Sequence, residues 1–348
     1  MGTIVGVDIG SNAVRAVEVS GYDTVKPVIV RQHEIALPDT SVRRGEVLEV
    51  GTVTTALRRL WSTGGFKTKD VVLGLGGPRI FARDLSVPKA TLGQIRESLP
   101  FQVQDMLPVP VGDALLDFYP IAEEAGEHGP AVRGMLVAAM KETVDANVGA
   151  VLAAGLRPVH VDLLSFALSR ALAPRRTAKG RDVIVSIGAS TTDIIVVDDG
   201  VPHFVRTIPN GGDDITRAIA SRLQISPEQA ETAKRTIGMG GAMLRPEDRP
   251  ALEVIYEVVG ELLNAIRNTL AYFATANPEE MPRRILLAGG GAQLLGLPGA
   301  LSELTGLPVV VAEPFESVQR ARTAGQRTAR DQQFVYTAAY GLALGAHS

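Results

Sequence analysis

The sequence contains no cysteine in its 348 residues. This absence excludes disulfide bonds, thiolate zinc sites, iron–sulfur clusters and a cysteine nucleophile. The chain also has no large excess of one charge, because 35 Lys and Arg residues stand against 38 Asp and Glu residues, for a formal charge of −3. A protein without a basic field is not expected to be a dedicated nucleic-acid binder. Its five histidines show no metal-ligand spacing, so we expect no histidine metal centre.

Long hydrophobic runs are missing as well. No segment approaches the roughly 20 consecutive apolar residues of a membrane-spanning helix. The first residues lead directly into an alternating strand pattern, and no basic leader with an apolar stretch precedes it. We therefore expect a cytoplasmic protein that would reach a membrane only through a partner.

The chain does contain enough apolar residues for a large core. Apolar residues make up 45% of the sequence and charged residues 21%, a composition typical of globular proteins. A chain of this length has room for about two domains.

The first half alternates strand-like and helix-like segments. Periodicity predicts strands over residues 3–8, 13–19, 28–35, 70–75, 134–140 and 158–162, and helices over 47–61, 143–156 and 164–172. Strands that alternate with helices indicate an α/β fold.

After a basic break at residues 174–180, the opening pattern returns. Strands are predicted over 182–187, 192–197, 203–208, 284–288 and 309–312, and helices over 213–223, 227–237, 251–276, 297–304 and 331–344. The strand, glycine turn and second strand around Gly10 match those around Gly188, which indicates an internal duplication. The alternative is a chance resemblance of two hairpins, but the later order of strands and helices repeats too.

One segment breaks this symmetry. Residues 83–130, with a predicted helix over 91–106 and a strand over 114–121, have no counterpart in the second half. We interpret this segment as an inserted small α/β subdomain with an exposed hairpin tip at 123–130. The predicted organisation is a first lobe of residues 1–82 and 131–174, the inserted subdomain 83–130, a second lobe 175–330, and a C-terminal helix at 331–348 that returns toward the first lobe.

The two glycine-containing turns are candidates for binding phosphate. Glycine permits a close approach, while backbone N–H groups and hydroxyls donate hydrogen bonds to phosphate oxygens. Asp8 and Asp193 would face the same cleft from equivalent places in the repeat, and carboxylates beside phosphate imply Mg²⁺ held largely through water. For either Asp alone, the alternative is an ordinary turn residue. The remaining candidate phosphate-binding residues are Gly10, Ser11, Asn12, Gly188, Ser190, Thr191 and Thr192.

A third glycine segment follows the predicted strand at 284–288. Gly289, Gly290 and Gly291 would offer bare backbone on which a purine or ribose can lie flat, and Gln293 can add a side-chain amide. Three glycines can also form a simple flexible turn. Two further residues, Glu231 and Lys234, share one face of a predicted helix, where a solvated ion pair is the alternative to a binding role.

Together these segments resemble the actin, sugar-kinase and actin-like chaperone superfamily. Residues 7–11 resemble its first phosphate loop, 187–193 its second and 287–292 its adenosine motif. The resemblance implies an actin-like, ribonuclease H-like duplicated fold, with two lobes around a cleft that holds ATP or ADP with Mg²⁺. It also implies that Glu231 and Lys234 contact the nucleoside, and that Gly211 and Gly212 are the superfamily's second-domain glycine pair.

Within the superfamily, residues 209–216, 228–238 and 266–273 resemble the PilM family of type IV pilus assembly proteins, with the FtsA cell-division family next. The insertion and the lack of a basic amphipathic tail at the C-terminus favour the PilM family. This resemblance implies an adaptor at the inner face of the cell membrane, whose inserted subdomain binds the N-terminal cytoplasmic peptide of a PilN-like membrane protein. The residues expected to line that groove, each of which can equally belong to a small core, are Leu85, Val87, Leu99, Phe101, Val103 and Leu107.

We do not expect efficient hydrolysis. Asp8 and Asp193 are the candidate catalytic carboxylates of the two turns. Actin-like ATPases usually place an acidic or amide residue after the strand that matches residues 159–161, where this chain has Asp162 and then leucines. Leucine cannot polarise water, so nucleotide would act as a clamp between the lobes unless a shifted register brings Asp162 into place. The alternatives are a small-molecule kinase of the same superfamily, for which we find no convincing base, and an FtsA-like filament protein.

Overall fold

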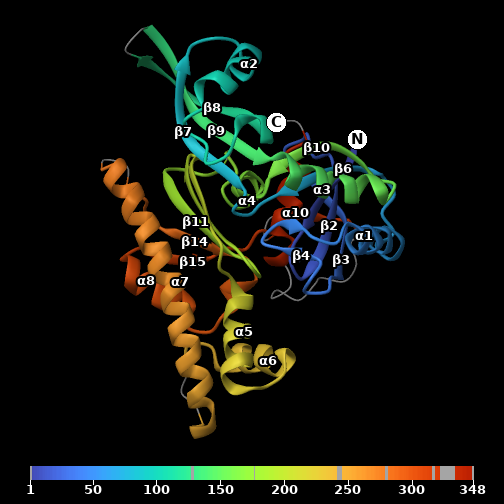
Figure 1. Cartoon of the computed structure of the whole chain (residues 1–348), viewed down its shortest axis with the longest axis vertical. Helices are drawn as coiled ribbons and strands as arrows, with labels where there is room; N and C mark the ends of the chain where they lie inside the picture. The colour runs from blue at the N-terminus through green and yellow to red at the C-terminus, as the bar shows by residue number, and fades with distance from the viewer. Residues whose placement is uncertain are drawn as a thin grey trace.

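The computed structural model describes residues 2–126, 129–175, 177–240, 245–278, 281–315, 318–321 and 334–346. Parts of four predicted features lie outside these residues: the hairpin tip at 127–128, the basic break at 176, the second lobe also at 241–244, 279–280, 316–317 and 322–330, and the C-terminal helix at 331–333 and 347–348. The described chain forms two large sheets, a three-stranded sheet and a two-stranded hairpin, with helices around them (Figure 1).

The first large sheet has six strands in the order β10-β6-β1-β2-β3-β16. Its strands β1 and β6 are mostly apolar, and each is buried at every position after its first residue, which suits a sheet that is covered on both faces. β1 pairs antiparallel with β2 and parallel with β6, and β6 pairs parallel with β10. The strands are β1 (Thr3–Ile9), β2 (Ala13–Ser20), β3 (Val28–Ala36), β6 (Asp70–Leu75), β10 (Arg157–Leu163) and β16 (Gln319–Arg320).

Helices cover both faces of this sheet. On one face, α1 (Val50–Gly64) and α3 (Lys141–Ala153) bury aliphatic side chains against β1 and β6. A short hairpin, β4 (Val42–Arg43) with β5 (Glu46–Val47), precedes α1. On the other face lie α4 (Leu164–Leu172) and α10 (Thr337–Leu344). α10 lies so close to β1 and α4 that a Cβ added at Gly6 or Gly341 would be 1.9 Å from a backbone oxygen.

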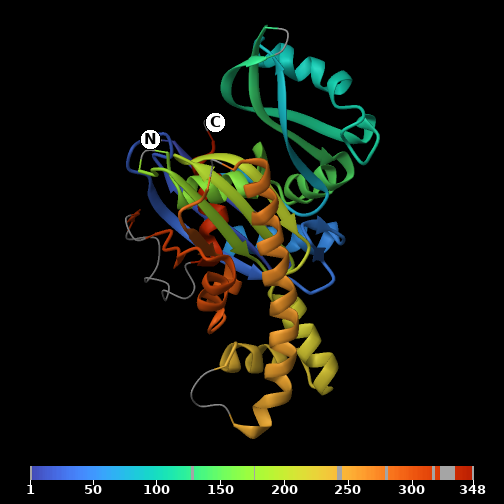
Figure 2. The same cartoon turned by 90° about the vertical axis from the view of Figure 1, so that its left-hand side faces the viewer.

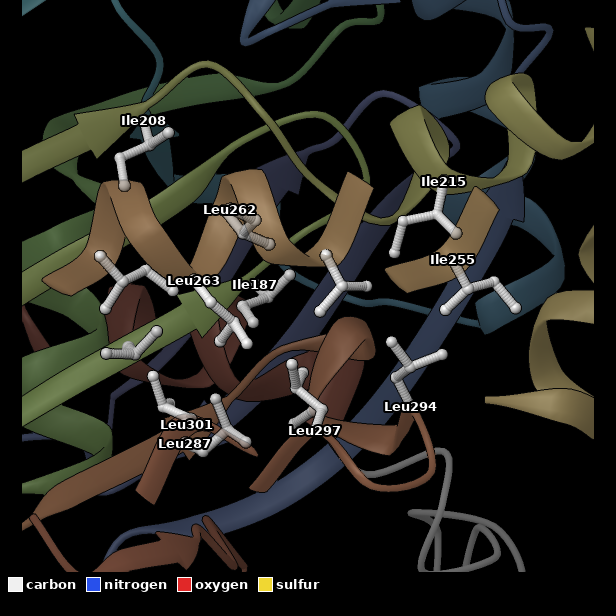
Figure 3. Close-up of a cluster of buried hydrophobic side chains, with 14 of the residues drawn as sticks. Ile187, Ile208, Ile215, Ile255, Leu262, Leu263, Leu287, Leu294, Leu297 and Leu301 are labelled. Atoms are coloured by element: carbon white, nitrogen blue, oxygen red, sulfur yellow. The ribbon is translucent and has the colours of Figure 1, made fainter. Parts of the chain in front are cut away.

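The second large sheet has five strands in the order β13-β12-β11-β14-β15. They are β11 (Arg181–Ile187), β12 (Thr192–Asp198), β13 (Val201–Ile208), β14 (Ile285–Ala288) and β15 (Val309–Val311). The accompanying helices are α5 (Gly212–Leu223), α6 (Pro227–Ile237), α7 (Arg249–Ala276) and α8 (Leu297–Thr305). An aliphatic core between this sheet and its helices includes Ile187, Leu263 and Leu287 (Figure 3).

The two large sheets share one topology. Strands β3-β2-β1-β6-β10 of the first correspond to β13-β12-β11-β14-β15 of the second, with antiparallel and parallel pairs at the same places. The same backbone hydrogen bond closes the turn after each first strand, from Gly10 N–H to Ala13 O at 3.0 Å and from Gly188 N–H to Thr191 O at 2.8 Å. The predicted duplicated α/β fold is confirmed.

The third sheet, in the order β7-β9-β8, carries α2 (Leu92–Gln102). Its strands are β7 (Ile80–Pro88), β8 (Ala114–Gly126) and β9 (Gly129–Met140). The sheet therefore includes residues 80–82 and 131–140, which the sequence assigned to the first lobe, because β9 pairs with β7 and β8 along that whole length. The helix predicted over 91–106 ends at Gln102, two residues after Pro100, whose missing N–H weakens the last turn.

The inserted sheet and the outer parts of α5, α6 and α7 project from opposite ends of the molecule (Figure 2). The insert also contacts the second large sheet, because Val205 of β13 packs with apolar residues of β7, β8 and β9. Throughout the part of the chain described above, no helix combines the length and the apolar character needed to cross a membrane.

Candidate functional site

A cavity of about 800 Å³ lies between the two large sheets, at the ends of β1 and β11. Both hairpin turns line it, together with the start of α5, part of α6 and the segment after β14. The predicted site residues that line the cavity are Asp8, Gly10, Ser11, Asn12, Gly188, Ser190, Thr191, Asp193, Gly212, Glu231, Lys234, Gly289, Gly290, Gly291 and Gln293. The fold thus brings together segments from both halves of the sequence.

The two hairpin turns contact each other directly across the cavity. Ser11 Oγ and Ser190 Oγ are 2.6 Å apart, although 179 positions separate them in the sequence. Asn12 Nδ2 donates a hydrogen bond to Asp213 Oδ1 at 2.9 Å, which joins the first turn to the beginning of α5. A ligand group inserted between the turns would therefore meet hydroxyl and amide donors from both lobes.

Two predicted ligand-binding residues, Thr192 and Gly211, are not among the residues that line the cavity. Thr192 is fully buried, and its Oγ1 donates to the backbone oxygen of Asn210 at 2.8 Å. Gly211 allows the second turn to lie against the start of α5, since a Cβ there would be 2.6 Å from Ala189 O. Both residues therefore position the second turn.

Asp8 and Asp193 are almost fully buried in the cavity wall. Burial raises the pKa of Asp8, and the charge of Arg15 opposes that rise. Burial also raises the pKa of Asp193 to about 6, although a hydrogen bond from Thr207 lowers it, and the charge of Asp8 adds to the rise. Two buried carboxylates that repel each other form a donor set suited to a divalent cation.

The two carboxylates do not occupy equivalent places in the repeat, and this prediction was wrong. The strand register pairs Asp8 with Arg15 in the first hairpin and Ser186 with Asp193 in the second. Asp8 therefore corresponds to Ser186, and Asp193 corresponds to Arg15. Asp8 lies on the first strand of its hairpin, before the turn, whereas Asp193 lies on the second strand of its hairpin, after the turn, so the two carboxylates belong to different strands of the repeat.

Arg15 is a cavity residue that the sequence reasoning missed. Its guanidinium forms an ion pair with Glu34 of β3 at 3.0 Å, and both side chains line the cavity. Arginine stays protonated in proteins, so it places a fixed positive charge next to buried Asp8. A signal was present in the sequence, because Arg15 follows the first turn at the hairpin position opposite Asp8.

The three glycines after β14 differ in whether the structure has room for a side chain. Gly289 adopts a φ of +80°, which favours glycine, and a Cβ on Gly291 would be 2.3 Å from Ile187 Cγ2. These two glycines allow close packing on β11. In contrast, a Cβ on Gly290 would meet nothing within 4 Å, and Gly290 is exposed where it lines the cavity. Gly290 is therefore the glycine whose bare backbone faces open space.

Glu231 and Lys234 belong to a hydrogen-bonded network between α5 and α6. Lys234 Nζ donates to Glu231 at 2.6 Å, to Thr216 Oγ1 at 2.9 Å and to Gly212 O at 3.1 Å, which uses all three of its N–H bonds. Burial would raise the pKa of Glu231, but hydrogen bonds from Lys234, Thr216 and Arg235 outweigh it and hold the pKa at about 2. Glu231 is therefore ionised, and Lys234 joins the two helices.

The position after β10 is apolar where it meets the cavity. Leu164 is a lining residue, whereas Asp162 is not. Asp162 forms an ion pair with Arg170 of α4 and accepts a hydrogen bond from its neighbour's N–H at 2.8 Å. The shifted register that would bring Asp162 into the cavity is not adopted.

The six predicted groove residues differ in how far they are buried in the inserted subdomain. Three are fully buried in the subdomain's own core, as the small-core alternative expects: Val87, Leu99 and Val103. Two are partly buried against this core: Leu85 and Leu107. The sixth, Phe101, has 84% of its surface exposed. Burial keeps the first three side chains away from any ligand on the surface, so they cannot line an open groove in this structure.

Comparisons with known proteins bear on the family and the fold of this chain. The family model described as Type IV pilus assembly protein PilM matches residues 6–347. A chain in the solved structure of a PilM-PilN type IV pilus biogenesis complex is 26% identical, with a TM-score of 0.85 over 99% of this chain and 98% of that chain. Cell division protein FtsA of Pseudomonas aeruginosa is 23% identical over 352 residues, which cover 90% of this chain and 83% of FtsA.

A more distant likeness shows the fold alone. MreB 5 of Spiroplasma citri, in a structure bound to AMPPNP, is 13% identical, with a TM-score of 0.52 over 89% of this chain and 91% of that chain. The predicted actin-like, two-lobed fold is confirmed by these structures. Since the family model extends over nearly the whole sequence, the chain belongs to the PilM family of type IV pilus assembly proteins.

Proposed function

We propose that this protein is a nucleotide-binding adaptor of a type IV pilus assembly platform. It holds ATP or ADP with Mg²⁺ between its lobes and binds the N-terminal cytoplasmic peptide of a PilN-like membrane protein, which keeps it at the inner face of the cell membrane. One observation carries the nucleotide part: the turns around Gly10 and Gly188 meet in the wall of one large cavity, with Ser11 and Ser190 2.6 Å apart.

The shape of the cavity supports a nucleotide that spans it. A volume of about 800 Å³ lies within the usual range of small-molecule pockets. The phosphates would lie between the two turns, where backbone N–H groups, hydroxyls and the guanidinium of Arg15 can reach them. The nucleoside would lie between the bare backbone of Gly290 and the ionised carboxylate of Glu231, which can accept a hydrogen bond from a ribose hydroxyl. The AMPPNP held by MreB 5 is consistent with this use of the fold.

The carboxylates fit a magnesium ion. Mg²⁺ prefers oxygen ligands and usually keeps several waters, and it would be held by Asp8 and Asp193 largely through water. When bound, the ion would supply positive charge to the nucleotide phosphates. The mutual repulsion of the two buried carboxylates favours this arrangement, because a cation between them would relieve it.

We further propose that the nucleotide serves mainly as a clamp and is hydrolysed slowly. The residue that meets the cavity after β10 is Leu164, and the neighbouring Asp162 is held by Arg170. Neither can orient an attacking water in this arrangement. An occupied cleft would instead hold the two lobes in one relative position.

The partner part of the proposal is supported by the likeness to a PilM-PilN complex and by the exposed surface of α2. Phe101 is the most exposed large apolar residue of the inserted subdomain, and Leu92 and Leu115 are 37% and 46% exposed. Partly buried Leu85 and Leu107 lie on the same small core. The fully buried residues of this core would support the peptide-binding surface from beneath.

Calorimetry with AMPPNP tests the nucleotide part. We expect binding in the presence of Mg²⁺ and weaker binding in EDTA. Purified, folded protein that takes up no adenine nucleotide would contradict the proposal. Slow turnover of ATP in a phosphate-release assay is expected as well, and fast turnover would refute the clamp.

A second assay separates the adaptor from its rivals. A synthetic peptide with the N-terminal residues of the PilN-like protein should bind, and a peptide with the same composition in scrambled order should not. Substrate-stimulated release of ADP over a panel of sugars would favour the kinase. Pelleting that depends on ATP would favour the filament protein.

A further inference from the structure

Thr207 belongs to a row of three side chains at the cavity end of the second large sheet. The strand register places Ser186 of β11 opposite Asp193 of β12, and Asp193 opposite Thr207 of β13. Ser186 and Asp193 line the cavity, whereas Thr207, which is half-buried, is not among the lining residues. Thr207 can therefore act on a ligand only through Asp193.

The hydrogen bond between these residues uses one specific carboxylate oxygen. Thr207 Oγ1 donates to Asp193 Oδ1 at 2.6 Å. This is the one hydrogen bond to the Asp193 carboxylate within the described residues, so Oδ2 is left for the cavity. A threonine on a strand has a stiff χ1 torsion, which makes it a well-defined donor. The carboxylate is thus held in one orientation, with its two oxygens in different environments.

The first lobe has no such arrangement at the corresponding place. There the row is Asp8, Arg15 and Glu34, and the residue that corresponds to Asp193 is Arg15. Its guanidinium is held by Glu34 at 3.0 Å. The two aspartates that line the cavity near the turns thus differ, because only Asp193 has a neutral donor from a neighbouring strand in its row.

We propose that Thr207 is a positioning residue that orients Asp193 so that a single oxygen faces the cation, and that this selects Mg²⁺ over Ca²⁺. The inference rests on the proposed nucleotide function. Ca²⁺ takes six to eight oxygen ligands and readily accepts both oxygens of one carboxylate, whereas Mg²⁺ keeps an octahedral shell with several waters. Because the hydrogen bond from Thr207 holds Oδ1 toward β13, binding of Ca²⁺ through both oxygens of Asp193 is disfavoured. Partners of metal ligands commonly change metal affinity 10–100-fold when they are removed.

The test compares Thr207→Val and Thr207→Ser with the wild-type protein. Each protein is loaded with AMPPNP, and its affinities for Mg²⁺ and for Ca²⁺ are measured separately by calorimetry. Valine keeps the shape of threonine and removes the donor, whereas serine keeps the donor. A matched control, Thr275→Val on the exposed face of α7, makes the same chemical change far from the cavity, and thermal unfolding checks that every variant is folded.

We expect Thr207→Val to lower the affinity for Mg²⁺ about 10–100-fold and to lower the ratio of the Mg²⁺ affinity to the Ca²⁺ affinity. Thr207→Ser and Thr275→Val should keep the Mg²⁺ affinity and this ratio close to the wild-type values. A ratio that valine leaves unchanged would overturn the inference, as would a serine variant that behaves like the valine variant. If the wild type takes up AMPPNP equally well in EDTA, the inference and the magnesium part of the proposed function fail, whereas nucleotide binding itself stands. If the wild type takes up no AMPPNP under any condition, both fail.

Discussion

Adding one methyl group at Gly290 should separate the binding role of the glycine segment from its structural role. A Cβ on Gly290 would meet nothing within 4 Å, and the residue is exposed in the cavity wall. Gly290 also begins a short 3₁₀ turn (Gly290–Gln293) and does not need a positive φ. Gly290→Ala should therefore leave the free energy of unfolding unchanged or raise it by about 0.4–1 kcal/mol, because alanine reduces the freedom of the unfolded chain.

The same methyl group would project to the place where we position the nucleoside. An extra methyl in a well-packed contact usually costs about 1–3 kcal/mol. That range corresponds to a loss of roughly 5–150-fold in AMPPNP affinity. The expected result of Gly290→Ala is thus a folded, equally stable protein that binds nucleotide weakly, measured by calorimetry and by thermal unfolding on the same preparation.

Two further glycines provide matched controls. A Cβ on Gly291 would be 2.3 Å from Ile187 Cγ2, so Gly291→Ala should cost about 1–3 kcal/mol of stability even without nucleotide. Gly260 lies inside α7, where a Cβ meets nothing within 4 Å, so Gly260→Ala should raise stability by about 0.5–1 kcal/mol and leave nucleotide binding unchanged. If Gly290→Ala binds AMPPNP as tightly as Gly260→Ala does, the nucleoside does not lie on this backbone.

Three further predictions concern other parts of the molecule. Burial raises the pKa of Asp193 to about 6, so the folded protein loses stability as the pH rises through that value. In EDTA and without nucleotide, Asp193→Asn should therefore be about 3 kcal/mol more stable to unfolding than the wild type at pH 7.5, but not at pH 4. An equal difference in stability at both pH values would contradict this. Phe101→Ala should weaken binding of the PilN-like peptide and keep the free energy of unfolding within about 0.5 kcal/mol of the wild type. Leu99→Ala should lower the free energy of unfolding by about 2–5 kcal/mol, because Leu99 is fully buried. Gly341→Ala should lower the melting temperature strongly, since its Cβ would lie 1.9 Å from Ala167 O; an unchanged melting temperature would show that α10 does not pack on α4 as described.

The sequence was most informative where local chemistry alone determines the structure. The strands around each hairpin were predicted to within one or two residues, because a run of apolar residues ends at a glycine turn in both halves. The predicted helix over 227–237 coincides with α6, where Ser226 caps the N-terminus and Pro227 occupies the first position. These signals lie within a few residues of one another along the chain.

The sequence was less informative where the answer depends on contacts between distant segments. Apolar character did not distinguish the buried Leu99 from the exposed Phe101, two residues further along α2, since only packing against the sheet decides between them. The alternative of an ion pair between Lys234 and Glu231 is seen in the structure. The hydrogen bonds from Lys234 to Gly212 and Thr216 were not predicted, because these acceptors belong to another helix. Similarly, the alternation in residues 131–140 predicted a strand but did not show which sheet it joins.

The chemistry of the cavity arises from the differences between the two copies of the repeated hairpin. Both copies supply the same turn, closed by the same backbone hydrogen bond at Gly10 and Gly188. At the paired positions beside the turn, however, the first copy carries an acid and a base, Asp8 and Arg15, where the second carries Ser186 and Asp193. In the first copy, Glu34 forms an ion pair with Arg15, so the charge of Arg15 is balanced within its own row. At the place of Arg15 the second copy carries Asp193, and the residues paired with it, Ser186 and Thr207, are neutral. The negative charge of Asp193 therefore has no basic partner in its row, and a divalent cation can balance it. The repeated hairpins therefore set the geometry of the cleft, and the sequence difference between them supplies the negative charge that attracts a cation.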